Sequence, residues 1–354
     1  MKKLPSPEEI AARYPLSRDG QARVRRDRSE VRAILAGNDP RFLLVLGPRS
    51  AWPFAAVLEY GARLVELERR VGDALKLVLR VQVQNQRTAR GWTGPVNQPD
   101  PFAPPDIEAG LFGCRRLMVC AVEMGLAIAD EALFTHNARG FAELLSWIGI
   151  GARSSEDQEH RVWASAAGAP VGMENPTSGC IGAGIDGVLA AQSPHVAVVD
   201  GCQVPTTGNP FAHLVLRGGV QGPNYHLDDL CLARRLMLER SILNPAVLVD
   251  AAHDGCRIDA CKDPEAQEDV LCEVLSNLRR RPELRALVRG FLLESFLLGG
   301  SQSLERCTPD TIVREGLSVT EPCLSWERTE ALLLDAAEEV RALGPVTARL
   351  RLSG

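Results

Sequence analysis

Arginines follow several apolar runs in this sequence, where buried strands are expected to end. Arg80 closes one run and Arg87 follows it, whereas Arg153 and Arg217 each follow a run of their own. A lone buried charge is costly, so such an arginine indicates an anionic partner, and its planar guanidinium binds phosphate oxygens in pairs. Any one of them alone is typical of a surface salt bridge. Together the four predict a pocket for phosphorylated or carboxylated small molecules.

Three further side chains belong to types that bind divalent ions. His253 and Glu294 each follow an apolar run, and Glu321 lies in the last loop before a C-terminal helical segment. Imidazole and carboxylate groups suit divalent transition ions, so the three are candidate metal ligands. The alternative is that they only hydrogen-bond to the arginines.

The segments that would position these residues alternate regularly along the chain. Short apolar runs are found at residues 42–46, 77–81, 126–129, 147–150, 170–172, 213–216, 246–249 and 288–293. Segments of helical periodicity follow most of them, at residues 54–70, 108–124, 155–167, 181–192, 227–240, 264–281 and 326–343. Eight strands alternating with helices predict an α/β fold, a (β/α)8 TIM barrel over residues 41–354, whose functional residues lie just after the strands.

Two segments lie outside this repeat. Residues 1–40 are expected to form an N-terminal helical extension that contacts a second copy of the chain, and residues 195–209 a small β-hairpin inserted before the sixth strand. An open doubly wound sheet is the competing architecture. It is disfavoured because no Gly-x-Gly-x-x-Gly follows the first run, where the chain has only Gly47-Pro48.

Composition excludes several classes of protein. The 354 residues are 45% hydrophobic and carry a formal net charge of −5, which argues against nucleic acid as the main partner. No apolar run approaches the roughly 20 residues of a membrane span, and no signal peptide is recognisable. None of the ten cysteines forms a Cys-x-x-Cys pair, so we expect reduced thiols in a cytoplasmic protein.

Several motifs resemble those of a known family in order and spacing. They are GPRS, RVQVQNQRTARGWTG, SWIGIGARSSEDQEHR, PVGMENPTSG, HLVLRGG, GPNY, VDAAH, LLESFLLGGSQ and SVTEPCLSWERT. Over residues 20–343 the chain resembles the type I 3-deoxy-D-arabino-heptulosonate 7-phosphate (DAHP) synthases. The resemblance implies a (β/α)8 barrel that condenses phosphoenolpyruvate with erythrose 4-phosphate at the start of the shikimate pathway, for aromatic amino acid biosynthesis. It also implies a divalent metal (Mn, Fe, Co or Zn) and a homodimer or homotetramer.

The resemblance assigns a role to each matching position. Arg80, Arg153 and Arg217 match the arginines that bind phosphoenolpyruvate. Arg87 and Thr88 match the pair that binds erythrose 4-phosphate. His253 and Glu294 match two metal ligands, and Glu321 stands in place of an aspartate ligand.

Three positions depart from the family pattern. Arg49 replaces the metal-binding cysteine, and a guanidinium has no lone pair to offer a metal, so the site is also compatible with no metal at all. Asn85 and Glu174 replace two active-site lysines, and asparagine is not a general acid or base. We therefore count Arg49, Asn85, Glu174 and His253 as the candidate catalytic positions.

Three hypotheses fit these departures. The first is a repurposed carbon–carbon bond-forming enzyme of specialised biosynthesis, acting on phosphorylated or carboxylated small molecules, in which Arg49 polarises a carbonyl. The second is the ordinary DAHP synthase reaction. The third is an inactive barrel that binds a ligand or a partner protein, with Glu174 and Arg49 paired across its mouth.

Overall fold

The computed structural model describes residues 2–86, 90–133, 140–199, 202–258 and 261–344. In this part of the chain, eight parallel strands close into a barrel in the order β1, β12, β9, β8, β5, β4, β3, β2. They span Phe42–Gly47 (β1), Leu75–Arg80 (β2), Ala127–Glu131 (β3), Trp147–Ile150 (β4), Val171–Glu174 (β5), His213–Leu216 (β8), Val247–Asp250 (β9) and Val288–Glu294 (β12). The predicted barrel is confirmed, and the open sheet is excluded because β1 pairs with both β2 and β12.

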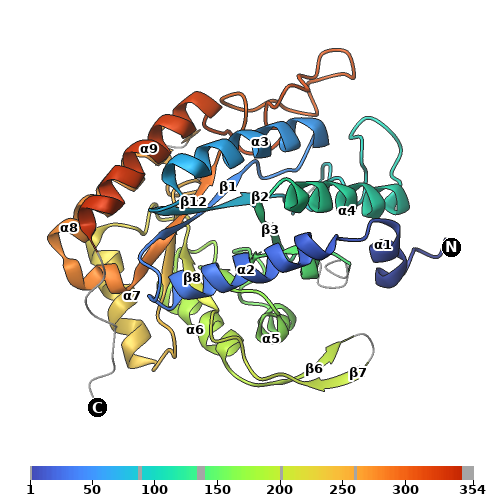
Figure 1. Ribbon diagram of the computed structural model, residues 1–354. Coiled ribbons are helices and arrows are strands. Elements are labelled where there is room, and N and C mark those ends of the chain that lie inside the picture. The colour runs from blue at the N-terminus through green and yellow to red at the C-terminus, as the bar shows by residue number, and fades with distance from the viewer. Residues whose placement is uncertain (1, 87–89, 134–139, 200–201, 259–260, 345–354) are drawn as a thin grey trace.

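Helices surround the barrel (Figure 1). They span Phe54–Val71 (α3), Ile107–Glu123 (α4), Gln158–Ala166 (α5), Ile181–Gln192 (α6), Leu227–Glu239 (α7), Ala266–Arg280 (α8) and Trp326–Leu343 (α9). Helices α4, α5 and α9 begin at Asp106, Asp157 and Ser325, whose side chains accept a hydrogen bond from the first turn. All seven predicted helical segments are helices, with ends that differ by a few residues.

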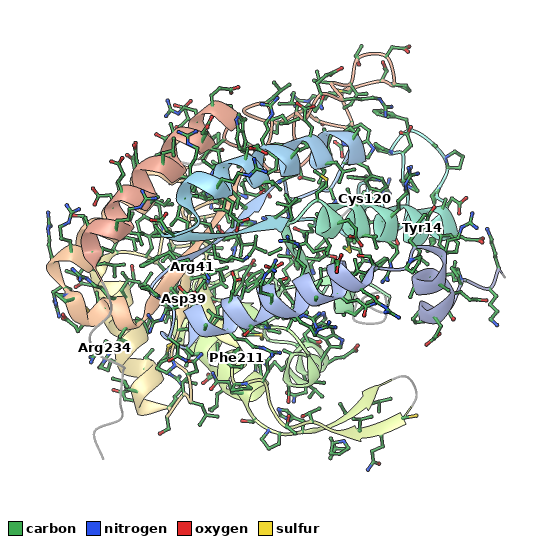
Figure 2. All side chains as sticks on the ribbon, in the orientation of Figure 1. Tyr14, Asp39, Arg41, Cys120, Phe211 and Arg234 are labelled. Carbon is green, nitrogen blue, oxygen red and sulfur yellow. The ribbon has the colours of Figure 1, made fainter. Side chains whose placement is uncertain are left out.

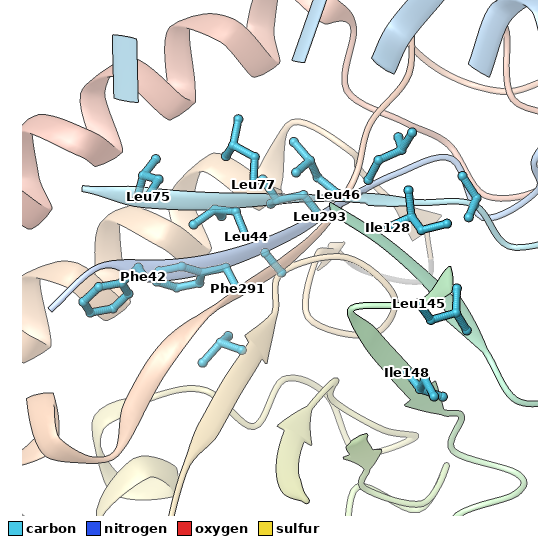
Figure 3. Close-up of a cluster of buried hydrophobic side chains, with 14 of the residues drawn as sticks. Phe42, Leu44, Leu46, Leu75, Leu77, Ile128, Leu145, Ile148, Phe291 and Leu293 are labelled. Atoms are coloured by element: carbon cyan, nitrogen blue, oxygen red, sulfur yellow. The ribbon is translucent and has the colours of Figure 1, made fainter. Parts of the chain in front are cut away.

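The strands are buried on both faces, as an enclosed parallel sheet requires. Alternate residues of β1 divide between the two faces: Leu44 and Leu46 pack outward toward the helices, whereas Leu43 and Val45 belong to a separate cluster inside the barrel. Figure 3 shows part of the outer cluster, drawn from neighbouring strands. On β2 the same alternation directs the side chains at the even-numbered positions 76, 78 and 80 to the barrel interior.

The N-terminal extension closes one end of the barrel. It forms helices α1 (Pro7–Arg13) and α2 (Arg18–Leu35), and in Figure 1 α2 leads from α1 toward β1. Three fully buried α2 side chains, Val31, Ile34 and Leu35, join the cluster inside the barrel. The extension is therefore part of the barrel's packing, and its predicted contact with a second copy stays a prediction.

Ionic contacts hold α2 against the strands. The Lys76 ammonium, at the start of β2, lies 2.8 Å from an Asp27 oxygen and 3.1 Å from a Glu30 oxygen of α2. Arg41, which precedes β1, lies 3.1 Å from a Glu30 oxygen of α2 and 2.7 Å from an Asp39 oxygen; Figure 2 labels Arg41 and Asp39 beside the end of α2. The charged segment of α2 thus faces the barrel as well as solvent.

Two antiparallel hairpins interrupt the repeat. Strands β6 (Val196–Val199) and β7 (Cys202–Pro205) confirm the predicted insertion and extend away from the barrel in Figure 1. Strands β10 (Arg257–Ile258) and β11 (Cys261–Lys262) follow β9. None of the described helices combines the length and apolar character needed to cross a membrane. The nine cysteines with described side chains are free thiols.

Candidate active site

A cavity of about 590 Å³ opens at the carboxyl ends of the strands. Charged side chains dominate its lining within the described residues. The basic ones are Arg49, Arg90, Arg153, Arg217 and Lys262, and the acidic ones are Glu131, Glu174, Asp254 and Glu321. Counted over the described residues with every carboxyl ionised, five basic and four acidic groups leave an excess of one positive charge. A phosphate monoester brings about −1.5 to −2 at neutral pH, so the described part of the lining alone balances less than one phosphate.

His253 is fixed at the floor of this cavity by a carboxylate behind it. Its Nδ1 lies 2.6 Å from an Asp250 oxygen at the end of β9. The backbone of His253 has φ of 48°, a left-handed conformation that is uncommon for residues other than glycine and is found at functional sites. Burial raises the pKa of Asp250 to about 6, against the effect of the nearby Arg217 and Arg80 cations.

Arg49 contacts the other ring nitrogen of that histidine. Its Nη1 lies 2.9 Å from His253 Nε2 and 3.4 Å from Glu321 Oε1. A guanidinium can only donate, so Nε2 accepts this hydrogen bond and the histidine proton resides on Nδ1, facing Asp250. Burial also lowers the pKa of His253 well below its usual value, which is consistent with a neutral ring.

Lys262, on β11, contacts the second oxygen of the same glutamate. Its Nζ donates to Glu321 Oε2 at 2.8 Å. Burial opposes ionisation of this carboxyl, but His253 and the Lys262 and Arg49 cations outweigh it and lower the pKa of Glu321 below its usual value. Glu321 is therefore a carboxylate that bridges two cations.

The residues present do not fit a divalent metal ion. His253 and Glu321 direct their lone pairs at Arg49, and Glu294 Oε1 lies 3.8 Å from His253 Nε2. Within the described residues, no three His, Cys, Asp or Glu side chains are grouped to hold a metal. The geometry agrees with the alternative given above, in which His253, Glu294 and Glu321 hydrogen-bond to arginines.

Arg80 lies beneath the cavity and does not line it. Its Nη1 donates to Glu294 Oε1 at 2.7 Å and its Nη2 to Gln82 Oε1 at 2.7 Å. Burial works against this charge, but the Glu294 carboxylate outweighs it and raises the pKa of Arg80. Gln82 in turn donates to Glu131 Oε2 at 2.5 Å, so Arg80 is connected to the cavity wall through an amide. The prediction that Arg80 faces the same mouth as the other arginines is thus corrected.

Arg217 lines the cavity between two carboxylates. Its Nη1 donates to Asp254 Oδ2 at 2.9 Å, and its Nε lies 3.5 Å from Glu174 Oε2. The same Glu174 oxygen accepts a hydrogen bond from the Ala152 amide at 2.8 Å. The predicted pair of Glu174 with Arg49 across the mouth is therefore wrong. Glu174 ends β5, and the neighbouring β8 leads directly into Arg217, which brings the two together.

Asn85 supports the loop that carries Arg49. With its amide oriented toward its acceptors, its nitrogen donates to Ser50 Oγ at 3.1 Å and to the Arg49 carbonyl at 3.3 Å. Arg153 lines the cavity from the loop after β4, where its Nη1 donates to Gln86 at 3.4 Å. Arg87 and Thr88 lie outside the described residues.

Two functional candidates were missed by reasoning from sequence. Glu131, at the end of β3, lines the cavity, and burial raises its pKa with help from nearby Glu174, against the effect of Arg49. Its position after an apolar run was a usable signal. Lys262 had no such signal, because the β10–β11 hairpin interrupts the alternation of strand and helix.

Comparison with known proteins agrees with this architecture. A sequence profile of the DAHP synthetase I family matches residues 17–334. The Tyr-sensitive phospho-2-dehydro-3-deoxyheptonate aldolase of Escherichia coli (strain K12) is 37% identical over 352 residues, covering 98% of this chain and 95% of the relative. The corresponding aldolase of Corynebacterium glutamicum is 34% identical, covering 96% and 92%. The solved structure of the Francisella tularensis SCHU S4 aldolase superposes with a TM-score of 0.90 at 31% identity, over 97% of this chain and 98% of that one.

Proposed function

The chain belongs to the DAHP synthetase I family, and on that premise we propose that it forms carbon–carbon bonds by an aldol-type condensation. The donor is a three-carbon enol phosphate or 2-oxo acid, and the acceptor is an aldehyde with less negative charge than a sugar phosphate. The observation that carries this proposal is Arg49, whose guanidinium lies in the cavity against His253 and Glu321.

The arginines at the mouth supply the donor site. Arg153 and Arg217 both line the cavity, and the planar fork of arginine suits the carboxylate or phosphate of a small donor. Glu174 and Asp254 offset part of the charge of Arg217. The site is therefore expected to hold one doubly charged anion more readily than two.

Arg49 is suited to stabilise the oxygen of the aldehyde. When C3 of the donor bonds to the aldehyde carbon, the aldehyde oxygen gains negative charge and, after protonation, ends as a hydroxyl. An enol phosphate donor then takes up water at C2 and releases inorganic phosphate, whereas a 2-oxo acid donor first loses a proton from C3. A fixed donor directed at that oxygen is worth roughly 3–4 kcal/mol of barrier. Among the described contacts, both hydrogen bonds of Arg49 use Nη1, which leaves Nε and Nη2 to serve a ligand in the cavity.

The proton for that oxygen can come from Glu131. Its raised pKa keeps a proton on the carboxyl closer to neutral pH, which is the property required of a general acid. Gln82 holds one oxygen of this carboxyl at 2.5 Å and so fixes its orientation at the cavity wall.

The ordinary reaction of phosphoenolpyruvate with erythrose 4-phosphate is the second candidate. The names of the relatives favour it, because each is an aldolase of phospho-2-dehydro-3-deoxyheptonate and covers nearly the whole chain. It would link this chain to the shikimate pathway. Arg49 argues against it, because its guanidinium lies 2.9 Å from His253 Nε2, where the resemblance places a metal ion.

A screen of donors and acceptors tests both candidates. Phosphoenolpyruvate and pyruvate would each be incubated with erythrose 4-phosphate and with unphosphorylated aldehydes, and products identified by mass spectrometry. We expect condensation products with unphosphorylated aldehydes. Product only from phosphoenolpyruvate with erythrose 4-phosphate would establish the ordinary reaction, and no product from any pair would reject an enzymatic role with these substrate classes.

A further inference from the structure

Two cations from separate parts of the chain meet at one carboxylate in the cavity. Arg49 follows β1 and contacts Glu321 Oε1, whereas Lys262 on β11 contacts Glu321 Oε2 at 2.8 Å. The two cations contact different oxygens of Glu321, so both contacts are present at the same time. The three side chains are only partly exposed, at 16% for Arg49, 29% for Lys262 and 25% for Glu321.

The hydrogen bonds use the one lone pair of His253 Nε2 and one acceptor site on each oxygen of Glu321. Arginine and lysine donate and do not accept at neutral pH, so His253 Nε2 and both oxygens of Glu321 act as acceptors toward them. His253 Nδ1 is occupied by Asp250 at 2.6 Å. The His253 nitrogen that would face a metal is therefore occupied by a guanidinium hydrogen.

The summed charge of the two cations equals that of a divalent ion. Arg49 and Lys262 each contribute one positive charge beside the cavity, and both line it. A divalent ion added to this cluster would lie within contact distance of a guanidinium, and two positive charges that close repel each other strongly.

We infer that Arg49 and Lys262 together take the place of a divalent metal ion in this chain. Arg49 supplies the donor that meets the substrate oxygen, and Lys262 supplies the second charge and fixes Glu321. The inference deepens the proposed function and rests on it for the identity of that oxygen. The replacement of the ion by two cations is a property of the folded protein and is testable without any substrate.

Cobalt titration tests the replacement directly, because a cobalt–thiolate bond gives a charge-transfer absorption band. The proteins compared are wild type, Arg49→Cys, Lys262→Gln, the double variant and Arg153→Cys. The last places a cysteine in the same cavity without removing the His253 contact. Urea unfolding of each protein confirms that it folds.

We expect wild type, Lys262→Gln and Arg153→Cys to bind no cobalt at the cavity, because Arg49 still contacts His253 in each. Arg49→Cys should bind one cobalt per chain with a thiolate band, since cysteine, histidine and glutamate then form a ligand set. The double variant should bind at least about tenfold more tightly, because one repelling cation is lost.

Two results would overturn the inference. One is that the wild-type protein binds one cobalt ion per chain and that the His253→Gln substitution abolishes this binding. The other is a folded Arg49→Cys variant that binds no more cobalt than Arg153→Cys. These outcomes are independent of the substrate screen: a chain that condenses nothing can still show the replacement, and a chain that condenses substrates can still bind a metal.

Discussion

Strand β2 carries a buried cation near each end, and the two cations have different surroundings. Lys76 is the second residue of the strand and is surrounded by Asp27, Glu30 and Glu68, with its ammonium 2.8, 3.1 and 3.7 Å from their oxygens. Arg80 ends the strand and has one carboxylate, Glu294, at 2.7 Å. Both lie on the inward face, four residues apart. The first is sealed by α2, and the second lies beneath an open cavity.

The difference separates a structural end of the barrel from a functional one. A buried carboxylate oxygen without a hydrogen-bond partner is found at both ends of the described barrel, Glu294 Oε2 near the mouth and Asp27 Oδ2 at the closed end. His253 at the mouth also has a positive φ, and proteins retain a strained backbone where a ligand or a reaction uses it. At the closed end, apolar packing by α2 and several carboxylates stabilise the fold instead.

The largest expected effect is at the closed end. Lys76→Met should lower the free energy of unfolding by about 3–5 kcal/mol, because Asp27 is then buried without its cation. Urea unfolding measures this. Arg69→Met, which breaks an exposed pair with Glu66, is the matched control and should cost about 0–1 kcal/mol. Equal losses from the two variants would contradict the assignment of Lys76 to stability.

Next in size is a loss of activity at the mouth. Arg49→Ala should reduce the rate of condensation about 10²–10³-fold, since it removes a donor to the developing oxyanion. Its cost in stability should be no more than about 2 kcal/mol, because Lys262 still pairs with Glu321. Steady-state kinetics and urea unfolding on one preparation measure both quantities. A stability loss as large as that of Lys76→Met would show that Arg49 serves the fold.

The third prediction concerns pH and the closed end. Burial lowers the pKa of His213 from 6.5 to about 4 at the start of β8, where Nε2 accepts from the Trp147 indole at 3.1 Å. The unfolded chain then binds this proton more readily. Stability should be unaffected by His213 above pH 6.5 and fall by up to about 1.4 kcal/mol per pH unit between pH 6.5 and 4.

Unfolding curves at a series of pH values measure this slope. His213→Asn removes the titrating ring, so subtracting its curve from that of wild type isolates one residue from other groups that titrate in the same range. An unchanged slope in the variant would assign the pH dependence elsewhere.

The smallest expected effect is on ligand binding at the mouth. Glu174→Gln removes a negative charge 3.5 Å from Arg217 Nε, so phosphoenolpyruvate should bind about tenfold more tightly, or about 1.4 kcal/mol. Isothermal titration calorimetry measures the affinity. Glu66→Gln, exposed on α3, makes the same change in net charge and should leave it unaltered. Equal gains in affinity from the two variants would indicate that the change in net charge causes the effect, and not the loss of the contact between Glu174 and Arg217.

The sequence was sufficient to predict the barrel but not its closed end. Eight apolar runs alternating with helical segments are compatible with few other folds. Because Arg153, Arg217 and His253 each follow such a run, they were correctly expected at one mouth of the barrel. The charged segment of α2 resembles a solvated helix face, yet Asp27 within it is buried. That burial depends on Lys76, which lies 49 residues away in the chain, and periodicity carries no information on such pairings.

The sequence also did not predict which side chains pair with each other in the candidate site. Glu174 meets Arg217 because β5 and β8 are neighbours in the barrel, despite the hairpin between them in the chain. Lys262 reaches Glu321 from a hairpin that breaks the strand and helix pattern. Side-chain type predicted what these residues can bind, whereas register and insertion decided which partner each one has.

A crystal structure grown with Mn²⁺ and phosphoenolpyruvate, with data collected at the manganese absorption edge, tests the central claim most directly. The account predicts phosphoenolpyruvate at Arg153 and Arg217, the Arg49 guanidinium within hydrogen-bond distance of His253 Nε2, and no anomalous peak between His253 and Glu321. An anomalous peak coordinated by His253 Nε2, with Arg49 displaced, would contradict it.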